Sequence, residues 1–413
     1  MDRRGDAHPC PAPRSGKRPD GVLPLGRTAQ GGARVTDRIV ITGVAINAPF
    51  GRTLEDLGSL LDGGIRRPKP VDRFPVGGAK AGSAHLHWPV QDIEALIDGT
   101  TETALAALDA ARLATGHRIG LALGSISGMD FDATGPRRAD DGVNALGRHC
   151  FDRLGLFGPL VHVTSACTSS AAALFWAKSI LENDDADVML AGGADRIRAV
   201  DFAGFNILRA MDPEGTRPFH TERRGITMGE GACILVLERM SHALARGADI
   251  HAVFSGGGLS SDGHHATAPR HDGLVAASRR ALAAAGLTPA DIQYVNCHGT
   301  GTPANDREEL KALQAVFGPH LRAVCVGSTK GFTGHWLGSA GAIEAAVLLS
   351  VLHRQRAPGM PWLSGPDSIL ASHTAGMEEA RGFRHVMSNS LGFGGNNASL
   401  IFSRFSRHAS EQG

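Results

Sequence analysis

A cysteine surrounded by small residues is the first candidate for chemistry in this sequence. Cys167 lies in the run Val-Thr-Ser-Ala-Cys-Thr-Ser-Ser-Ala (163–171), between a short β-prone segment at 160–163 and an alanine-rich segment at 171–182. A cysteine at a strand-to-helix junction lies near unpaired N–H groups and the positive end of the helix dipole, which favour the nucleophilic thiolate. The alternative is a small, buried hydrophobic residue, which is the commoner fate of a single cysteine.

Two histidines and a lysine in the C-terminal half also follow apolar, strand-like runs. His298 begins the run His-Gly-Thr-Gly-Thr-Pro, and Lys330 and His335 lie in Ser-Thr-Lys-Gly-Phe-Thr-Gly-His. A histidine at a strand end can project into a cleft, where neighbouring threonine hydroxyls could bind a polar ligand arm. Glu344 is a candidate counter-charge for Lys330, and Phe393 is the one large side chain in a later glycine-rich loop. Each of these residues, taken alone, could also be structural or solvated.

Strands and helices must position these residues, and they alternate along the chain. Short apolar runs typical of buried strands occupy 38–46, 119–123, 160–163, 187–193, 231–238, 250–257, 292–297, 324–327, 384–388 and 398–402. Helical patterns occupy 103–114, 171–182, 272–285, 305–317 and 338–353, with Asp272 as a cap, and 66–100 is expected to be loop. This alternation predicts a layered α/β fold with a central mixed or parallel sheet.

The alternation runs twice, with a join near 246–250, so the sequence predicts a duplicated fold. We divide the chain into a disordered arm at 1–36, an N-terminal half with the nucleophile at 37–248, a C-terminal half with the two histidines at 249–407, and a tail at 408–413. The arm is rich in Pro, Gly and Arg and lacks the apolar core of a secretory signal.

Composition excludes several classes of function. A chain of 413 residues with 42% hydrophobic content can bury a sizeable core, and its net charge of +1 favours no strongly charged partner such as a nucleic acid. The six cysteines form no C-x-x-C pair, which argues against disulfides and zinc and suits a reducing cytoplasm. No apolar run approaches the roughly 18 residues of a membrane span. Asp262 and the histidines near it lack a second ligand cluster, so we expect no metal site.

Together the motifs resemble the β-ketoacyl-acyl carrier protein synthases, which are the condensing enzymes of the thiolase superfamily. The nucleophile turn, His-Gly-Thr-Gly-Thr-Pro-x-Asn-Asp, Ser-Thr-Lys-x-x-Thr-Gly-His and Gly-Phe-Gly-Gly-x-Asn occur in family order between about Arg38 and Phe402. The two-histidine form is similar to the elongating type of synthase. The resemblance implies a thiolase-like duplicated α/β fold in layered α-β-α-β-α architecture. It also implies an acyltransferase that condenses an acyl-cysteine with malonyl-ACP, with loss of CO2, in fatty-acid or polyketide elongation.

The resemblance also implies roles for individual residues. Cys167 would accept the acyl chain, and His298 and His335 would stabilise the enolate that forms when the malonyl thioester loses CO2. The backbone N–H groups of Cys167 and Phe393 would form the oxyanion hole, and Phe393 would gate the two half-reactions. The implied catalytic residues are Cys167, His298, His335, Lys330, Glu344 and Phe393. The implied substrate-binding residues are Thr300, Thr302, Thr267, Gly394 and Ile226.

The same resemblance implies the partners. An acyl carrier protein would deliver the phosphopantetheine arm, so the enzyme would need no bound cofactor. The synthase would act in the cytoplasm as a homodimer, or as a heterodimer with a related ketosynthase-like subunit, without nucleic acid or membrane.

Two departures from the family pattern keep alternatives open. Arg223-Arg224-Gly225-Ile226 stands where the family has Arg-Asp-Gly-Phe, and the segment between the first strand and Cys167 is short. One alternative is the ketosynthase subunit of a specialised type II polyketide or aryl-polyene system, paired with a chain-length-factor-like partner. A non-catalytic partner subunit is disfavoured because such subunits lack the nucleophile. A cysteine hydrolase would leave Lys330 and His335 without a role.

Overall fold

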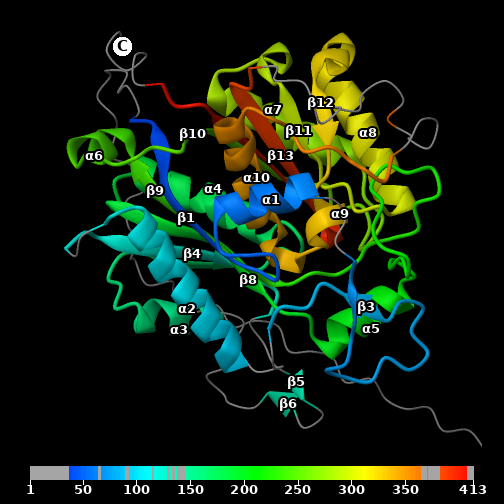
Figure 1. Ribbon diagram of the computed structural model, residues 1–413. Coiled ribbons are helices and arrows are strands. Elements are labelled where there is room, and N and C mark those ends of the chain that lie inside the picture. The colour runs from blue at the N-terminus through cyan, green and yellow to red at the C-terminus, as the bar shows by residue number, and fades with distance from the viewer. Residues whose placement is uncertain are drawn as a thin grey trace, which may run out of the picture. The chain divides into compact units, whose positions relative to one another are not determined.

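A computed structural model describes residues 37–63, 67–88, 93–113, 116–127, 131–132, 135–136, 145–363, 370 and 382–406 (Figure 1). These residues belong to one compact unit that begins at Asp37. The predicted arm at 1–36 and the predicted tail at 408–413 lie outside the described residues, as does part of the short segment that precedes Cys167.

A ten-stranded sheet forms the centre of the fold, and its strand order is β12-β11-β13-β14-β10-β1-β9-β8-β4-β7. Its strands are β1 (Ile39–Asn47), β4 (Ile119–Gly124), β7 (Leu160–Val163), β8 (Val188–Asp195), β9 (Gly231–Arg239), β10 (Ala252–Ser261), β11 (Tyr294–Asn296), β12 (Cys325–Gly327), β13 (His385–Gly392) and β14 (Asn396–Ser403). Two short pairs lie apart from it: β2 (Lys69–Pro70) with β3 (Ser83–Ala84), and β5 (Phe131–Asp132) with β6 (Gly135–Pro136).

The sheet is built from two copies of one topology. In the first copy, β4 pairs in parallel with β7 and β8, β9 is antiparallel to β8, and β1 is antiparallel to β9. In the second copy, β11, β12, β13, β14 and β10 repeat this pattern in the same order. A short antiparallel pairing of β1 with β10 joins the copies. The predicted duplication is therefore visible in the strand order.

Helices separate and cover the two halves of the sheet. They are α1 (Leu54–Gly63), α2 (Ile93–Ala110), α3 (Ala145–Arg153), α4 (Ser169–Glu182), α5 (Ala199–Ile207), α6 (Met240–Ala245), α7 (His271–Ala285), α8 (Pro303–Phe317), α9 (Lys330–Thr333) and α10 (Ala340–Arg354). The helices α4 and α10 contact each other and strands of both halves, so they form the central layer. Figure 1 shows α2 and α3 on one side and α7 and α8 on the other. The layers are therefore α-β-α-β-α, as expected.

The central helix α10 is buried along most of its length because sheet strands and α4 surround it. Its sequence is rich in Ala, Leu and Val, which pack closely and fit a helix with no solvent-facing side. Within the described residues, the stretch Leu337–Arg354 is long and apolar enough to cross a membrane by length and composition alone. However, 89% of it is buried inside the protein, which is the environment of a core helix.

The predicted elements agree with the structure except at a few ends. The helix expected at 103–114 begins earlier, at Ile93, so the expected loop at 66–100 contains its first two turns as well as β2 and β3. Asp272 does not cap α7, because the residue at the N-cap position is Arg270 and Asp272 lies in the first turn as its ion-pair partner. Neither difference moves a candidate site residue.

Candidate active site

Cys167 lies on a tight turn that leads from β7 into the N-terminus of α4. The preceding residue, Ala166, has a φ of 53°, a left-handed conformation that residues with a Cβ seldom adopt. Two hydrogen bonds of the Ser169 hydroxyl hold the turn, since it donates to the Ala166 carbonyl and accepts from the N–H of Ser165. The Cys167 side chain is thereby presented to a cavity while it is only 7% exposed.

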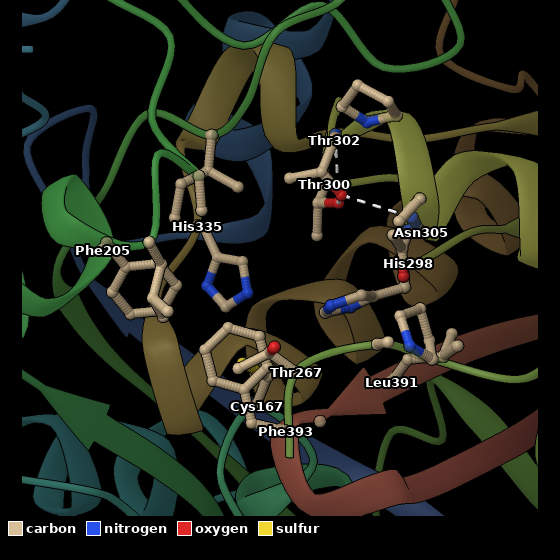
Figure 2. A pocket seen from close by; sticks show the side chains of 18 of the residues that line it. Cys167, Phe205, Thr267, His298, Thr300, Thr302, Asn305, His335, Leu391 and Phe393 are labelled. Atoms are coloured by element: carbon tan, nitrogen blue, oxygen red, sulfur yellow. Dashed lines mark hydrogen bonds between the residues drawn. The ribbon is translucent and has the colours of Figure 1, made fainter. Parts of the chain in front are cut away.

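The two predicted histidines belong to the second half of the fold and lie close to Cys167. His298 follows β11, and His335 follows α9, which lies between β12 and α10. The Cys167 sulfur and one ring nitrogen of each histidine all lie within 4.8 Å of one another. The two rings are nearly perpendicular, with centroids 5.3 Å apart. Figure 2 shows both imidazoles projecting into one cavity beside Cys167 and Phe393.

Hydrogen bonds on the far side of each ring fix its tautomer. The backbone N–H of Leu337 donates to Nδ1 of His335 at 2.9 Å, and the Lys330 ammonium lies 3.2 Å from Nδ1 of His298. Because Nδ1 accepts in both rings, each neutral ring carries its proton on Nε2. Burial and the Lys330 charge lower the pKa of His335 to about 3 and the pKa of His298 well below its usual value. Both imidazoles are therefore neutral N–H donors.

This tautomer also bears on metal binding. Cys167, His298 and His335 are close enough together to hold a metal ion. A metal-bound histidine, however, usually donates its other N–H to a carboxylate or carbonyl, which leaves a lone pair for the metal. Here the outer nitrogens accept hydrogen bonds instead, so the inner nitrogens carry protons. The donor set fits hydrogen-bond donation to an oxyanion better than metal ligation.

Lys330 and Glu344 form a buried ion pair behind the histidines. Their side chains are 1% and 3% exposed, the Lys330 ammonium donates to a Glu344 carboxylate oxygen, and neither residue lines the cavity. The hydroxyl of Ser390 donates to the second Glu344 oxygen at 3.4 Å. Burial raises the pKa of Glu344, while the Lys330 charge opposes that effect. Lys330 therefore connects the position of His298 to α10, on which Glu344 lies.

Burial, and not the N-terminus of α4, sets the direction in which the pKa of the Cys167 thiol shifts. It raises the pKa of the thiol to about 12, against the lowering effects of the Lys330 charge and a hydrogen bond from the Phe393 N–H. The direction is opposite to that expected from the helix N-terminus alone, because the thiolate loses its hydration in this enclosed site. Phe393 nevertheless lines the same cavity as Cys167, so its backbone N–H is a candidate donor for an oxyanion hole. A Cβ at Gly392 would lie 3.0 Å from the Ser165 carbonyl oxygen, so a larger residue there would require a small shift of the turn that carries Cys167.

The cavity has a volume of about 310 Å³ and contains most of the predicted substrate-binding residues. Thr267, Thr300, Thr302 and Ile226 line it, and the hydroxyls of Thr300 and Thr302 lie 2.9 Å apart. Gly394 is not among the lining residues. Its N–H donates to the Ala266 carbonyl, so it joins the glycine loop to the segment that carries Thr267.

Three buried carboxylates that the sequence analysis did not single out position the site. Glu309 accepts from the backbone N–H groups of His298 and Gly299, at 2.7 and 2.8 Å. Asp306 accepts from the N–H of Phe219, and Asp195 accepts from the N–H of Ser339. Burial raises the pKa of Glu309 to about 7 and that of Asp195 to about 6. The available signal for Asp306 was its place at the end of the His-Gly-Thr-Gly-Thr-Pro-x-Asn-Asp motif, and Glu309 follows it on the same helix with Ala312 and Leu313 one turn further on.

Phe205 was also missed, although it forms part of the cavity wall. Its ring stacks on Phe393 with centroids 5.5 Å apart and an angle of 23°, and it lies 6.3 Å from the His335 ring (Figure 2). Phe205 lies on α5, between β8 and β9, in a segment with no motif of its own.

Comparison with known proteins agrees with the fold. Residues 99–243 match the family model of the beta-ketoacyl synthase N-terminal domain, and residues 251–362 match the model of the C-terminal domain. A 3-oxoacyl-[acyl-carrier-protein] synthase 2 of Coxiella burnetii is 32% identical, over 89% of this chain and 98% of that protein. The mitochondrial 3-oxoacyl-[acyl-carrier-protein] synthase of Arabidopsis thaliana is 40% identical, over 63% of this chain and 59% of the plant protein.

A solved structure of similar architecture is the ishigamide ketosynthase/chain length factor. It has a TM-score of 0.81 and 29% identity, covering 90% of this chain and 100% of that chain. The chain belongs to the β-ketoacyl synthase family, within the thiolase superfamily. It is accordingly an acyltransferase of the 3-oxoacyl-synthase type, which acts in acyl-chain elongation.

Proposed function

We propose that Cys167, His298 and His335 carry out a decarboxylative Claisen condensation between an acyl group held on Cys167 and malonyl-ACP. The observation that carries this proposal is the cluster itself, in which a thiol from one half and two N–H-donating imidazoles from the other lie within 4.8 Å. The reaction needs a nucleophile and stabilisation of two different oxyanions, and this cavity has candidates for each.

The first half-reaction transfers the acyl group. The Cys167 sulfur attacks the thioester carbonyl, a new carbon–sulfur bond forms, and the carrier's thiol leaves with the proton that the cysteine gives up. The N–H groups of Cys167 and Phe393 bind the oxyanion of the tetrahedral intermediate. In support, Phe393 lines the same cavity as Cys167, and its backbone acts to lower the pKa of the Cys167 thiol.

The second half-reaction forms the carbon–carbon bond. The bond between the malonyl carboxylate and the α-carbon breaks, CO2 leaves, and the electron pair becomes an enolate. The Nε2–H groups of His298 and His335 bind the enolate oxygen. The α-carbon then attacks the acyl carbonyl, and the Cys167 thiolate leaves and is reprotonated. Neutral imidazoles suit this step because a cation placed at the malonyl carboxylate would stabilise the ground state that must decompose.

Lys330, Glu344 and Phe393 have supporting roles in this proposal. Lys330 holds His298 in the donating tautomer, and Glu344 neutralises the Lys330 charge. Phe393 is the gate between the two half-reactions, and its stacking on Phe205 gives the closed position a defined partner. Thr267, Thr300 and Thr302 bind the pantetheine arm, since their positions in the cavity wall offer hydroxyls along its length.

The partners follow from this chemistry. An acyl carrier protein brings both substrates, and the phosphopantetheine arrives with it, so the reaction uses no resident cofactor and takes place in the cytoplasm. We also propose that the chain pairs with a second ketosynthase-like subunit, most simply another copy. In support, β7 is an edge strand of the sheet, and Phe157 beside it and Trp176 on α4 are 66% and 47% exposed.

The alternatives gain less support. The short segment that motivated a specialised polyketide or aryl-polyene subunit lies partly outside the described residues, so nothing favours that reading over the main one. A hydrolase needs an imidazole that accepts a proton from water, whereas both rings here present N–H groups to the cavity. A non-catalytic partner subunit would not need Cys167 and both histidines assembled around one cavity.

Intact-protein mass spectrometry after incubation with a panel of acyl-carrier thioesters tests the first half-reaction. We expect a mass increase equal to the acyl group in the unaltered protein and its complete loss in Cys167→Ala. Cys150→Ala is the matched control, because Cys150 is also buried but lies on α3 and does not line the cavity. This variant should keep the adduct. An undiminished adduct on Cys167→Ala would refute the assignment. Native spectra of the same samples report the number of copies.

A further inference from the structure

The permanently charged side chains that the described residues contribute to the cavity wall all carry positive charge. Among the described residues that line it, the only permanently charged side chains are Arg209 and Arg224, and no aspartate, glutamate or lysine lines it. The rest of the lining is a thiol, imidazoles, an amide, hydroxyls and apolar groups. A cavity with two guanidinium groups and no carboxylate is suited to a ligand that carries negative charge.

Backbone pairing brings the two arginines to the same part of the wall. Met211 and Ile226 form a parallel bridge, in which the Ile226 N–H donates to the Ala210 carbonyl at 2.7 Å and the Asp212 N–H donates to the Ile226 carbonyl at 2.9 Å. Gly225 permits this approach, since a Cβ there would lie 2.3 Å from the Ala210 oxygen. Arg209 and Arg224 each come shortly before these paired positions, so they flank the cavity together.

Exposure places both arginines at the outer end of the cavity. The Arg224 side chain is 43% exposed, and Arg209 is also exposed. Cys167, His298 and His335, at the reacting end, are 7%, 2% and 2% exposed. An anionic group bound by the arginines therefore lies near solvent, away from the reacting carbon atoms.

The arginines are available to a ligand. Arg224 pairs with Glu214 at 2.5 Å, but that carboxylate is 64% exposed, and such solvent-exposed pairs contribute little to stability. An incoming dianion or monoanion can replace it at little cost. Among the described residues, no carboxylate lies within ion-pair distance of Arg209. The Asp212 side chain, which is fully buried, lies 3.7 Å from Nε of Arg224 and helps to hold that side chain in position.

We propose that Arg224 and Arg209 form a receptor for the phosphate group of the phosphopantetheine arm at the mouth of the cavity. This inference rests on the proposed function, which supplies the thioester arm. Guanidinium groups bind phosphate oxygens through paired, charge-assisted hydrogen bonds, and a phosphodiester is the one permanent anion on that arm. The malonyl carboxylate is excluded as the ligand because it must lie beside the buried histidines. Arg224 is thus a positioning residue that sets the depth to which the arm enters.

Steady-state condensation kinetics with small-molecule malonyl donors test this assignment. The acyl donor is held constant, and malonyl-phosphopantetheine is compared with malonyl-pantetheine, which lacks the phosphate. In the unaltered protein, removal of the phosphate should raise KM about tenfold or more and leave kcat within about twofold. In Arg224→Gln and Arg209→Gln, the two donors should differ in KM by less than about threefold.

Arg217→Gln is the matched control. Arg217 lies 3.8 Å from Asp212 and 3.9 Å from Glu214, so it belongs to the same charge network, but it does not line the cavity. This variant should keep the full phosphate effect. An equal phosphate effect in Arg224→Gln and in the unaltered protein would overturn the proposal.

The carrier-bound donor distinguishes the remaining explanation. If Arg224→Gln raised KM for malonyl-ACP but not for malonyl-phosphopantetheine, the arginine would contact the carrier's protein surface, and the proposal would be wrong. Failure of the unaltered protein to condense any donor would instead refute the proposed function. The two failures are therefore separable.

Discussion

The reactive groups of the site are held in protonation states that their neighbours determine. A backbone N–H and a lysine ammonium each occupy the outer nitrogen of one histidine, which leaves two N–H donors facing the cavity. The cysteine is protonated at rest because burial raises its pKa to about 12. Resting protonation protects the sulfur from adventitious reaction, and the bound thioester must supply the environment in which the thiolate forms.

Sequence analysis could name these residues but not their protonation states. Cys167, His298 and His335 lie in recognisable motifs, whereas their pKa values depend on burial by segments that are distant in sequence. The Leu337 N–H is only two residues from His335, yet the hydrogen bond to Nδ1 requires the turn at the start of α10. The helix-terminus argument for Cys167 failed for the same reason, because it ignored desolvation.

Alkylation rates test the raised pKa of Cys167. Because only the thiolate reacts, the rate of iodoacetamide labelling should rise about tenfold per pH unit between pH 7 and pH 9, with no plateau. Peptide mass spectrometry measures labelling at this cysteine, with Cys167→Ala as the blank. A rate that levelled off below pH 8 would mean that the helix N-terminus outweighs burial.

The elements contribute to the site through matching junctions of the two repeats. Cys167 lies between β7 and α4, and Lys330 and His335 lie at the equivalent junction between β12 and α10. The strand-helix alternation and its duplication were predictable from apolar runs. The contacts of Asp195 and Asp306 were not, because Asp195 accepts from Ser339 across the central layer and Asp306 accepts from Phe219 in the other half.

The buried pair of Lys330 with Glu344 should contribute to stability as a coupled unit. Lys330→Met or Glu344→Leu alone should lower the free energy of unfolding by about 3–5 kcal/mol, because each leaves a buried polar group without its partner. The double variant should lose at least about 2 kcal/mol less than the sum of the single losses. Denaturant titration followed by circular dichroism measures all four proteins. Additive losses would contradict a coupled pair.

The cavity exists only because the two repeats of the fold face each other. One repeat contributes Cys167, the other contributes both imidazoles, and the segment between β8 and β9 contributes Phe205, Arg209 and Arg224. That segment contains the Arg-Arg-Gly-Ile departure from the family pattern. The pairing of Met211 with Ile226 places this departure beside the cavity, and the sequence alone does not reveal that pairing. Convergence of the motifs was predictable from the resemblance, but the shape and charge of the cavity wall were not.

Release of CO2 from malonyl-ACP by a protein that cannot be acylated tests this convergence most directly. Cys167→Gln removes the nucleophile but leaves the two histidine donors, so it should still release CO2. Adding His298→Ala or His335→Ala to that variant should reduce the release by about 100-fold, as expected for loss of an oxyanion donor. CO2 release that was absent from Cys167→Gln, or unchanged when both imidazoles were removed, would contradict the account.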